Sequence, residues 1–249
     1  MDAQYRSLNG KTVLVSGGAS GIGEAIVRAF ASQGAKVGFV DLNTEAGNAL
    51  AAELGSNVHF ETVDLRDVPA YQAAIGKIRA KLGPITVLVN NAARDDRHTI
   101  DQVTPDYWRE RFATNIDHQF FAAQAVYKDM EAAGGGSIIN MGSTSYLVSD
   151  DSFAAYKTSK SAVIGLTRAL ARELGPHNIR VNCLIPGWIM TERQVTMWLT
   201  PDGEKELMKR QCLKRRLVPD DISTTAVFLA SQDAAAMTAQ SFIVDGGWY

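Results

Sequence analysis

Seven short runs of apolar, often β-branched residues recur along the chain, and longer segments with helical spacing separate them. Most of the runs are almost continuously apolar, which is typical of strands that are covered on both faces. The runs occupy residues 12–16, 36–41, 58–64, 86–91, 137–142, 180–186 and 241–245. The helical segments occupy residues 21–33, 44–54, 67–82, 106–131, 152–174 and 219–231. This alternation predicts an α/β fold, a doubly wound parallel sheet of seven strands with helices on both faces.

One long connection does not follow this strand–helix alternation. It spans about residues 187–218, between the sixth strand and the last helix. A connection of this length in a compact domain is usually a functional element. We therefore expect residues 187–218 to cover a substrate. No linker or internal repeat interrupts the remainder, so residues 1–249 are expected to form a single domain.

Composition narrows the classes of function. The chain is 46% apolar and 21% charged with a net charge of −2 and no basic block, so nucleic acid and anionic membrane are not expected partners. The two cysteines and four histidines lack ligand spacing, so no metal site is expected. No apolar run reaches the ~18 residues of a membrane span, and the start M-D-A-Q-Y-R-S lacks the apolar stretch of a signal peptide. These features predict a cytoplasmic protein.

The first predicted strand runs directly into a glycine-rich turn, S-G-G-A-S-G-I-G, at residues 16–23. Gly17, Gly21 and Gly23 would allow a tight turn and a close approach of the backbone to a phosphate. The helix that follows offers free N–H groups to a pyrophosphate. Any tight turn favours glycine, but the position in the first strand–helix–strand unit predicts a dinucleotide site.

Asp41 ends the second predicted strand, eighteen residues beyond Gly23. An acid near that distance hydrogen-bonds the adenine ribose of NAD and repels the 2′-phosphate of NADP. Because residues 18–20 and Leu42 include no arginine or lysine, NAD is the expected cofactor. The alternative is that Asp41 caps the next helix. Asp64 closes the third strand, where its carboxylate could receive the adenine amino group.

The stretch F-A-A-Y-K-T-S-K, residues 153–160, places Tyr156 and Lys160 one helical turn apart. A phenol titrates near pKa ~10 and a lysine near ~10.4, so neither is an obvious acid or base at neutral pH. The two could simply be neighbours on a surface helix. Alternatively, the ammonium lowers the pKa of the phenol until it can exchange protons with a substrate.

These motifs, in this order, resemble the short-chain dehydrogenase/reductase family over essentially the whole chain. Ser16 stands where the family has threonine before the glycines, and the other matching segments are N-N-A-A at 90–93, T-N-I at 114–116, Ser143, Y-x-x-x-K at 156–160, P-G at 186–187 and D-G-G at 245–247. The resemblance implies a Rossmann fold, a dinucleotide-binding catalytic domain over residues 1–249 and a homotetramer. Trp248 and Tyr249 would then lie at a subunit contact or close a neighbouring site.

The resemblance also implies roles for single residues. Tyr156 takes the substrate proton as a phenolate, Lys160 supports it and binds the nicotinamide ribose, and Ser143 holds the reacting oxygen. Asn115 would position a water beside Lys160; the alternative is a core asparagine that bends its helix. The implied cofactor contacts are Gly17, Ser20, Gly21, Ile22, Gly23, Asp41, Leu42, Asp64, Leu65, Asn91, Ala92, Tyr156, Lys160, Pro186, Gly187 and Ile189.

Two segments bear on the substrate, the charged R-D-D-R-H at 94–98 and the tryptophan-containing, polar stretch 188–204. Sugars are held by an aromatic face and many hydrogen-bonding side chains, so this composition favours a sugar over a steroid or an acyl chain. The alternative is a solvated loop, with tryptophans that cover the core or an interface. The candidate substrate contacts are Asp95, Ser143, Ser145, Tyr156, Trp188 and Gln194.

The same loops, together with Q-C-L-K-R-R-L-V-P at 211–219, are similar to those of the NAD-dependent D-xylose 1-dehydrogenase branch of the family. This similarity implies oxidation of the anomeric hydroxyl of an aldose such as D-xylose, L-arabinose or D-galactose to the lactone. The alternatives are a dehydrogenase of another polyol, keto-sugar acid or carbonyl compound and, outside enzymes, a protein that binds NADH as a sensor.

Overall fold

The computed structural model describes residues 3–148 and 152–249, so Met1 and Asp2 of the polar N-terminal stretch lie outside it. All seven predicted strands are present and pair in parallel in the order β3-β2-β1-β4-β5-β6-β7. The strands are β1 (Thr12–Ser16), β2 (Lys36–Asp41), β3 (Val58–Thr62), β4 (Ile85–Asn90), β5 (Gly136–Met141), β6 (Ile179–Pro186) and β7 (Ser241–Val244). The predicted α/β class and the doubly wound parallel sheet are therefore confirmed.

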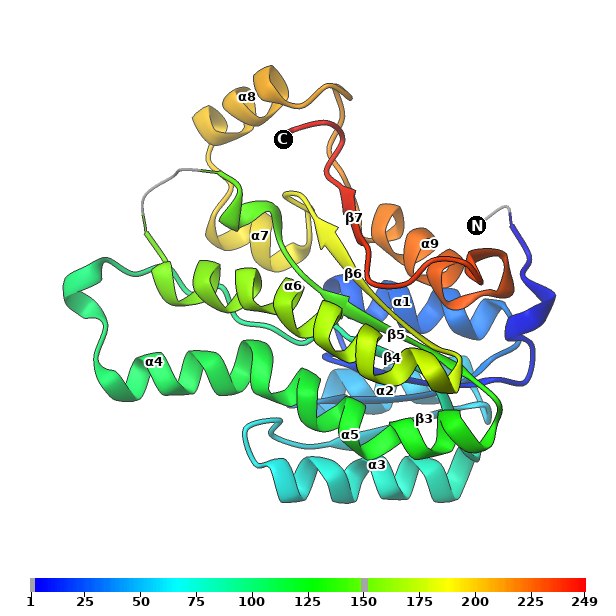
Figure 1. Cartoon of the computed structure of the whole chain (residues 1–249). Coiled ribbons are helices and arrows are strands. Elements are labelled where there is room, and N and C mark those ends of the chain that lie inside the picture. The colour runs from blue at the N-terminus through cyan, green and yellow to red at the C-terminus, as the bar shows by residue number, and fades with distance from the viewer. Residues whose placement is uncertain (1–2, 149–151) are drawn as a thin grey trace.

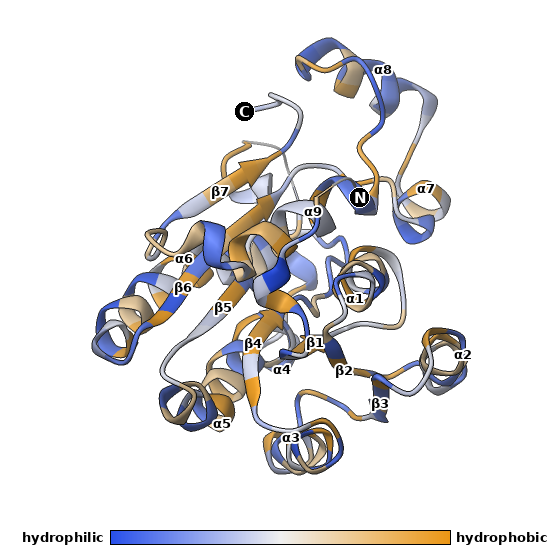
Figure 2. Cartoon of the chain, turned by 90° about the vertical axis from the view of Figure 1, so that its right-hand side faces the viewer, coloured by the Kyte–Doolittle hydropathy of each residue, from blue (hydrophilic) through white to orange (hydrophobic). Residues whose placement is uncertain are grey.

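Helices cover both faces of the sheet (Figure 1). They are α1 (Gly21–Ser32), α2 (Thr44–Leu54), α3 (Val68–Leu82), α4 (Pro105–Phe112), α5 (His118–Ala132), α6 (Ala154–Leu174), α7 (Glu192–Met197), α8 (Pro201–Arg210) and α9 (Pro219–Ala230). Figure 2 looks along the sheet, with α1, α2 and α9 on one side and α3, α5 and α6 on the other.

The alternation of side chains along each strand builds one apolar core on each face of the sheet. Val13 and Val15 face α1 and α9, where they join the buried Phe30. Leu14 between them points the other way and joins Leu88 in the cluster beneath α3, α5 and α6. Because both faces are covered, the strands are apolar at nearly every position, as the sequence pattern indicated.

The predicted strands agree with the observed ones to within one or two residues; the largest difference is that β3 ends at Thr62, two residues before Asp64. The segment predicted as a single helix over 106–131 is helical from Pro105 to Ala132, but it is not α-helical throughout. A π-helical turn at Ala113–Asp117 separates α4 from α5. In this turn the side chain of Asn115 accepts a hydrogen bond from the Arg94 N–H (2.8 Å) and donates to the Arg94 carbonyl (3.1 Å). Asn115 is therefore a core asparagine at the point where its helix is interrupted, a role that is compatible with holding a water beside Lys160.

The long segment 187–218 folds into two short helices, α7 and α8, which lie beyond the carboxyl ends of β6 and β7 (Figure 1). Each helix begins after a threonine cap: Thr191 Oγ1 accepts from the Gln194 N–H (3.3 Å) and Thr200 Oγ1 from the Gly203 N–H (3.0 Å). Across the described part of the chain, no helix is both long and apolar enough to span a membrane.

Candidate active site

A cavity of about 1540 Å³ lies at the carboxyl edge of the sheet, where the turns after β1, β2, β4, β5 and β6 converge. It is lined by every residue proposed above for cofactor or substrate binding. Asn115 is the exception among the predicted site residues, because it is fully buried and lies behind the lining. Within residues 3–148 and 152–249, no group of histidine, cysteine and acidic side chains could hold a metal ion.

The glycine turn after β1 has no room for side chains. Gly17 and Gly21 have φ angles of +67° and +57°, which other residues rarely adopt. A Cβ on Gly23 would lie 1.8 Å from the Gly17 carbonyl oxygen, so only glycine allows the turn to close onto α1. The Asn91 side chain donates to the carbonyls of Ser16 and Gly17, both at 3.0 Å, and so joins the end of β4 to the turn. This cradle fits the pyrophosphate of a dinucleotide.

Asp41 lies beside that turn. One carboxylate oxygen accepts from the Ala19 N–H and the other from the Asn43 N–H, each at 3.0 Å. The cap of α2 is Asn43, whose side chain accepts from the Ala46 N–H, so the alternative of Asp41 as the helix cap is wrong. Asp41 remains in the cavity lining, at the position where an adenine ribose lies in such folds.

Asp64 also lines the cavity, but its carboxylate is paired with Arg66 at 2.6 Å. Hydrogen bonds from this guanidinium hold the pKa of Asp64 below its usual range. An adenine amino group that contacts Asp64, as proposed, must therefore bind the same carboxylate as Arg66.

Tyr156 and Lys160 stand one turn apart on α6, and the Lys160 Nζ lies 5.7 Å from the centre of the Tyr156 ring. Lys160 is 1% exposed and donates to the Met141 carbonyl at 2.8 Å. Burial lowers the pKa of Lys160 to about 8. Burial, and after it the Asp95 carboxylate, raises the pKa of Tyr156 to about 12, while a hydrogen bond with Ser143 opposes that rise. The surface-neighbour interpretation of the pair is therefore wrong, because both groups line the cavity and Lys160 is almost fully buried.

The two serines after β5 are arranged differently from each other. Ser143 accepts from the Ser145 N–H through its Oγ at 3.1 Å, and its hydroxyl is the one that reaches Tyr156. Ser145 Oγ is buried without a partner among the residues that the structure describes. Both hydroxyls belong to the cavity wall.

Three of the proposed substrate contacts form one chain of hydrogen bonds. Trp188 Nε1 donates to Gln194 Oε1 (2.9 Å), and Gln194 Nε2 donates to Asp95 Oδ2 (2.7 Å). Trp188 also stacks with Trp248, with ring centres 6.4 Å apart and an angle of 25°. The C-terminal Trp248 thus lines the cavity of its own chain, while Tyr249 is 68% exposed.

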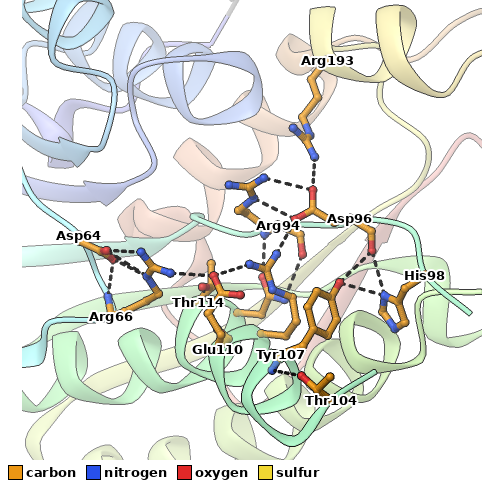
Figure 3. Close-up of polar contacts among 12 residues, drawn as sticks. Asp64, Arg66, Arg94, Asp96, His98, Thr104, Tyr107, Glu110, Thr114 and Arg193 are labelled. Carbon is orange, nitrogen blue, oxygen red and sulfur yellow. Dashed lines mark hydrogen bonds and ion pairs between the residues drawn. The ribbon is translucent and has the colours of Figure 1, made fainter. Parts of the chain in front are cut away.

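A network of ion pairs, which the sequence did not reveal, supports this wall (Figure 3). The Asp96 carboxylate contacts Arg111 (2.7 Å), Arg193 (2.8 Å) and Arg94 (3.1 Å), which come from α4, from α7 and from its own loop. Arg111 also pairs with Glu110, which in turn pairs with Arg66. The charged run R-D-D-R-H was visible in the sequence, but its partners lie too far along the chain to be recognised.

Comparison with known proteins gives the family. A family model described as "Enoyl-(Acyl carrier protein) reductase" matches residues 17–249. The chain belongs to the short-chain dehydrogenase/reductase family, whose members are oxidoreductases, and its fold and catalytic motifs agree with that membership.

Individual relatives cover nearly the whole chain. The protein named "Probable galactose dehydrogenase GalD" of Rhizobium meliloti (strain 1021) is 50% identical over 98% of this chain and 97% of its own length. The D-xylose 1-dehydrogenase of Caulobacter vibrioides (strain NA1000 / CB15N) is 45% identical over 99% of this chain and 98% of its own. A solved structure of a short-chain type dehydrogenase/reductase from Mycobacterium ulcerans is 28% identical, with a TM-score of 0.91, and the match covers 99% of this chain and 91% of that one.

A Gly23→Ala substitution should abolish cofactor binding, because the added methyl group collides with the backbone of Gly17. Titration of the protein with NADH, followed by fluorescence, measures this loss. The matched control is Gly165→Ala on α6, where a Cβ meets nothing within 4 Å, and its affinity should equal that of the wild type. Retained affinity in Gly23→Ala would contradict the assignment of the turn.

Proposed function

We propose that this protein is an NAD-dependent aldose 1-dehydrogenase, which oxidises the anomeric hydroxyl of a sugar such as D-xylose, L-arabinose or D-galactose to the aldonolactone. The observation that carries the proposal is one cavity that combines the Tyr156–Lys160 pair with a wall of tryptophan, carboxylate and amide groups. The names of the two relatives at 50% and 45% identity support the same class of substrate.

The reaction needs Tyr156 as a base, and its surroundings decide whether it can act as one. Burial raises its pKa to about 12, so positive charge must favour the phenolate. Lys160, with a pKa near 8, carries such a charge over most of its population at neutral pH. NAD held by the glycine turn and Lys160 would supply a second positive charge and the acceptor for the hydride from C1. Tyr156 then takes the hydroxyl proton while the C1–O bond becomes a carbonyl.

The remaining residues hold the reactants in place. Ser143 donates its hydroxyl hydrogen bond to the reacting oxygen and keeps that oxygen within reach of Tyr156. Asn115 acts indirectly, because its side chain fixes Arg94 at the start of the loop that carries Asp95. Asp95 and Gln194 exchange their mutual hydrogen bond for bonds to sugar hydroxyls.

We propose the cofactor contacts given above for the same cavity, with NAD preferred over NADP. Asp41 supports this preference, because a carboxylate at the end of the second strand would repel the 2′-phosphate of NADP. Two arginines line this part of the cavity, but carboxylates neutralise both: Arg28 pairs with Glu24 and Glu53, and Arg66 with Asp64 and Glu110. No uncommitted cation in this neighbourhood of the described chain offsets Asp41.

Segment 187–218 is proposed to cover the bound sugar, because α7 is tied to the loop after β4 by Arg193 and Gln194. We also propose the homotetramer that the family resemblance implies. Large apolar side chains exposed on helix α5 and strand β7, Phe120 and Ile243, support burial against another subunit.

Purified protein should form NADH from one or two sugars of a panel that contains D-xylose, L-arabinose, D-galactose, D-glucose, L-fucose and L-rhamnose. Tyr156→Phe should abolish this turnover while NADH binding persists, since only the proton acceptor is removed. The absorbance of NADH measures the rate, and fluorescence titration measures binding. A panel without turnover would refute the aldose assignment, and turnover in Tyr156→Phe close to wild type would refute the mechanism.

Asp41→Asn should lower the ratio of kcat/KM with NAD to kcat/KM with NADP by about tenfold or more, because the repulsion of a 2′-phosphate is removed. Steady-state rates with each cofactor at saturating sugar measure the ratio. Asp106→Asn, on the exposed surface of α4, is the matched control and should leave the ratio unchanged. An unchanged ratio in Asp41→Asn would overturn the assigned role of the carboxylate.

A further inference from the structure

Arg97 is a cation in the cavity wall that the mechanism above leaves unused. Three other arginines on this side, Arg94, Arg111 and Arg193, all pair with Asp96. Arg97 differs from them: across residues 3–148 and 152–249 its guanidinium has neither an ion pair nor a hydrogen bond, and it lies over two aromatic rings. All five of its N–H donors are therefore available to a ligand.

Two aromatic side chains fix the position of this guanidinium. Its Cζ lies 3.9 Å from the centre of the Phe153 ring and 5.3 Å from that of Trp198. The three residues come from the loop after β4, the start of α6 and the end of α7. Such stacking holds an arginine without using its donors. The site thus presents a cation whose orientation is set before a ligand arrives.

The backbone around this clamp is strained. Phe153 has a φ of +44°, an unusual conformation for a bulky residue, and such strain concentrates at functional sites. The neighbour of Arg97 holds it in place: the His98 carbonyl accepts from the Phe153 N–H (2.9 Å), and His98 Nε2 accepts from the Ala155 N–H (3.3 Å). The loop that carries Arg97 is therefore docked directly onto the helix that carries Tyr156.

The charge of Arg97 also reaches the reacting centre. Among the described residues, the charged and polar groups that act on or lie beside the Tyr156 side chain are Asp95 and Arg97 from the loop after β4, Lys160 from α6 and the Ser143 hydroxyl. Arg97 lowers the pKa of Tyr156, whereas Asp95 raises it. The guanidinium stacks on Phe153, whose ring centre lies 5.6 Å from that of Tyr156, so Arg97 lies on the side of the cavity where a sugar bound at Tyr156 would extend.

We propose that Arg97 is a substrate-binding residue that donates hydrogen bonds to hydroxyl oxygens of the aldose, on the part of the ring away from C1. A polyhydroxylated ring needs donors as well as acceptors, and Asp95 supplies only acceptors. This inference rests on the proposed function, since it assumes an aldose in the cavity.

The test compares Arg97→Gln and Arg97→Lys with Arg109→Gln, a control on the exposed face of α4. The probes are D-xylose and D-galactose, each with its single-deoxy analogues. Arg97→Gln should raise the KM of the better sugar by about tenfold or more and leave the KM of NAD unchanged. For one deoxy analogue, the kcat/KM of the wild type should already be low, because the missing hydroxyl is the partner of Arg97. Arg97→Gln should not lower the kcat/KM for this analogue any further. Arg109→Gln should behave as the wild type.

The pH profile of kcat/KM tests whether the charge of Arg97 acts on Tyr156, whereas the deoxy analogues separate a substrate contact from a purely structural clamp. Loss of the Arg97 charge raises the pKa of Tyr156, so the acid limb should move to higher pH in Arg97→Gln and stay in place in Arg97→Lys. Asp95→Asn should move the same limb to lower pH, because a charge of opposite sign is lost.

An unchanged KM in Arg97→Gln would overturn the inference. A raised KM together with a further loss of kcat/KM for every deoxy analogue in Arg97→Gln would also overturn it, since a structural clamp without a sugar contact predicts that pattern. In both cases wild-type turnover of the parent sugar shows that the proposed function still stands. Absence of wild-type turnover is the separate failure of the proposed function itself.

Discussion

The common direction of the seven strands is the constraint on which the site depends. Parallel neighbours cannot be joined by tight hairpins, so a crossover follows each strand and every carboxyl end opens on one edge of the sheet. The strand order reverses between β1 and β4, and a crevice forms where the two crossovers diverge. The glycine turn, Asp41 and Asn91 meet there, and the turns after β5 and β6 complete the cavity. Residues more than a hundred positions apart thus become neighbours without any local signal between them.

A second constraint is the cost of charge in an enclosed space. Lys160 is almost fully buried, with one hydrogen bond to Met141, and its lowered pKa records that cost. Elsewhere in the cavity wall the cost is offset by pairing, as where three guanidiniums surround Asp96. Among the described residues of this wall, Lys160 and Arg97 are cations that form no ion pair. Positive charge at this place favours a phenolate at Tyr156, which connects the electrostatics of the fold with its chemistry.

The sequence predicted the sheet closely because buried parallel strands leave continuous apolar runs, and β1, β2 and α2 have the predicted bounds. All site residues that were proposed from the sequence, except Asn115, line one cavity of the structure. The π-helical turn between α4 and α5 was not predicted, because its Asn115 side chain forms hydrogen bonds with the backbone of Arg94, which is distant in the sequence. The helices of segment 187–218 could have been found from their caps, Thr191 and Thr200. Arg97 could not, because its aromatic partners are separated from it in sequence.

The central claim, hydride removal from C1 of an aldose, is tested most directly by isotope transfer. The protein would be incubated with NAD and with the sugar of the panel that it oxidises fastest, carrying deuterium at C1. Mass spectrometry of the reduced cofactor and NMR of the sugar product then show where the label resides. We expect the deuterium to appear in the reduced cofactor and C1 to become a carboxyl carbon. Deuterium retained at C1, with an oxidised carbon elsewhere in the ring, would contradict it.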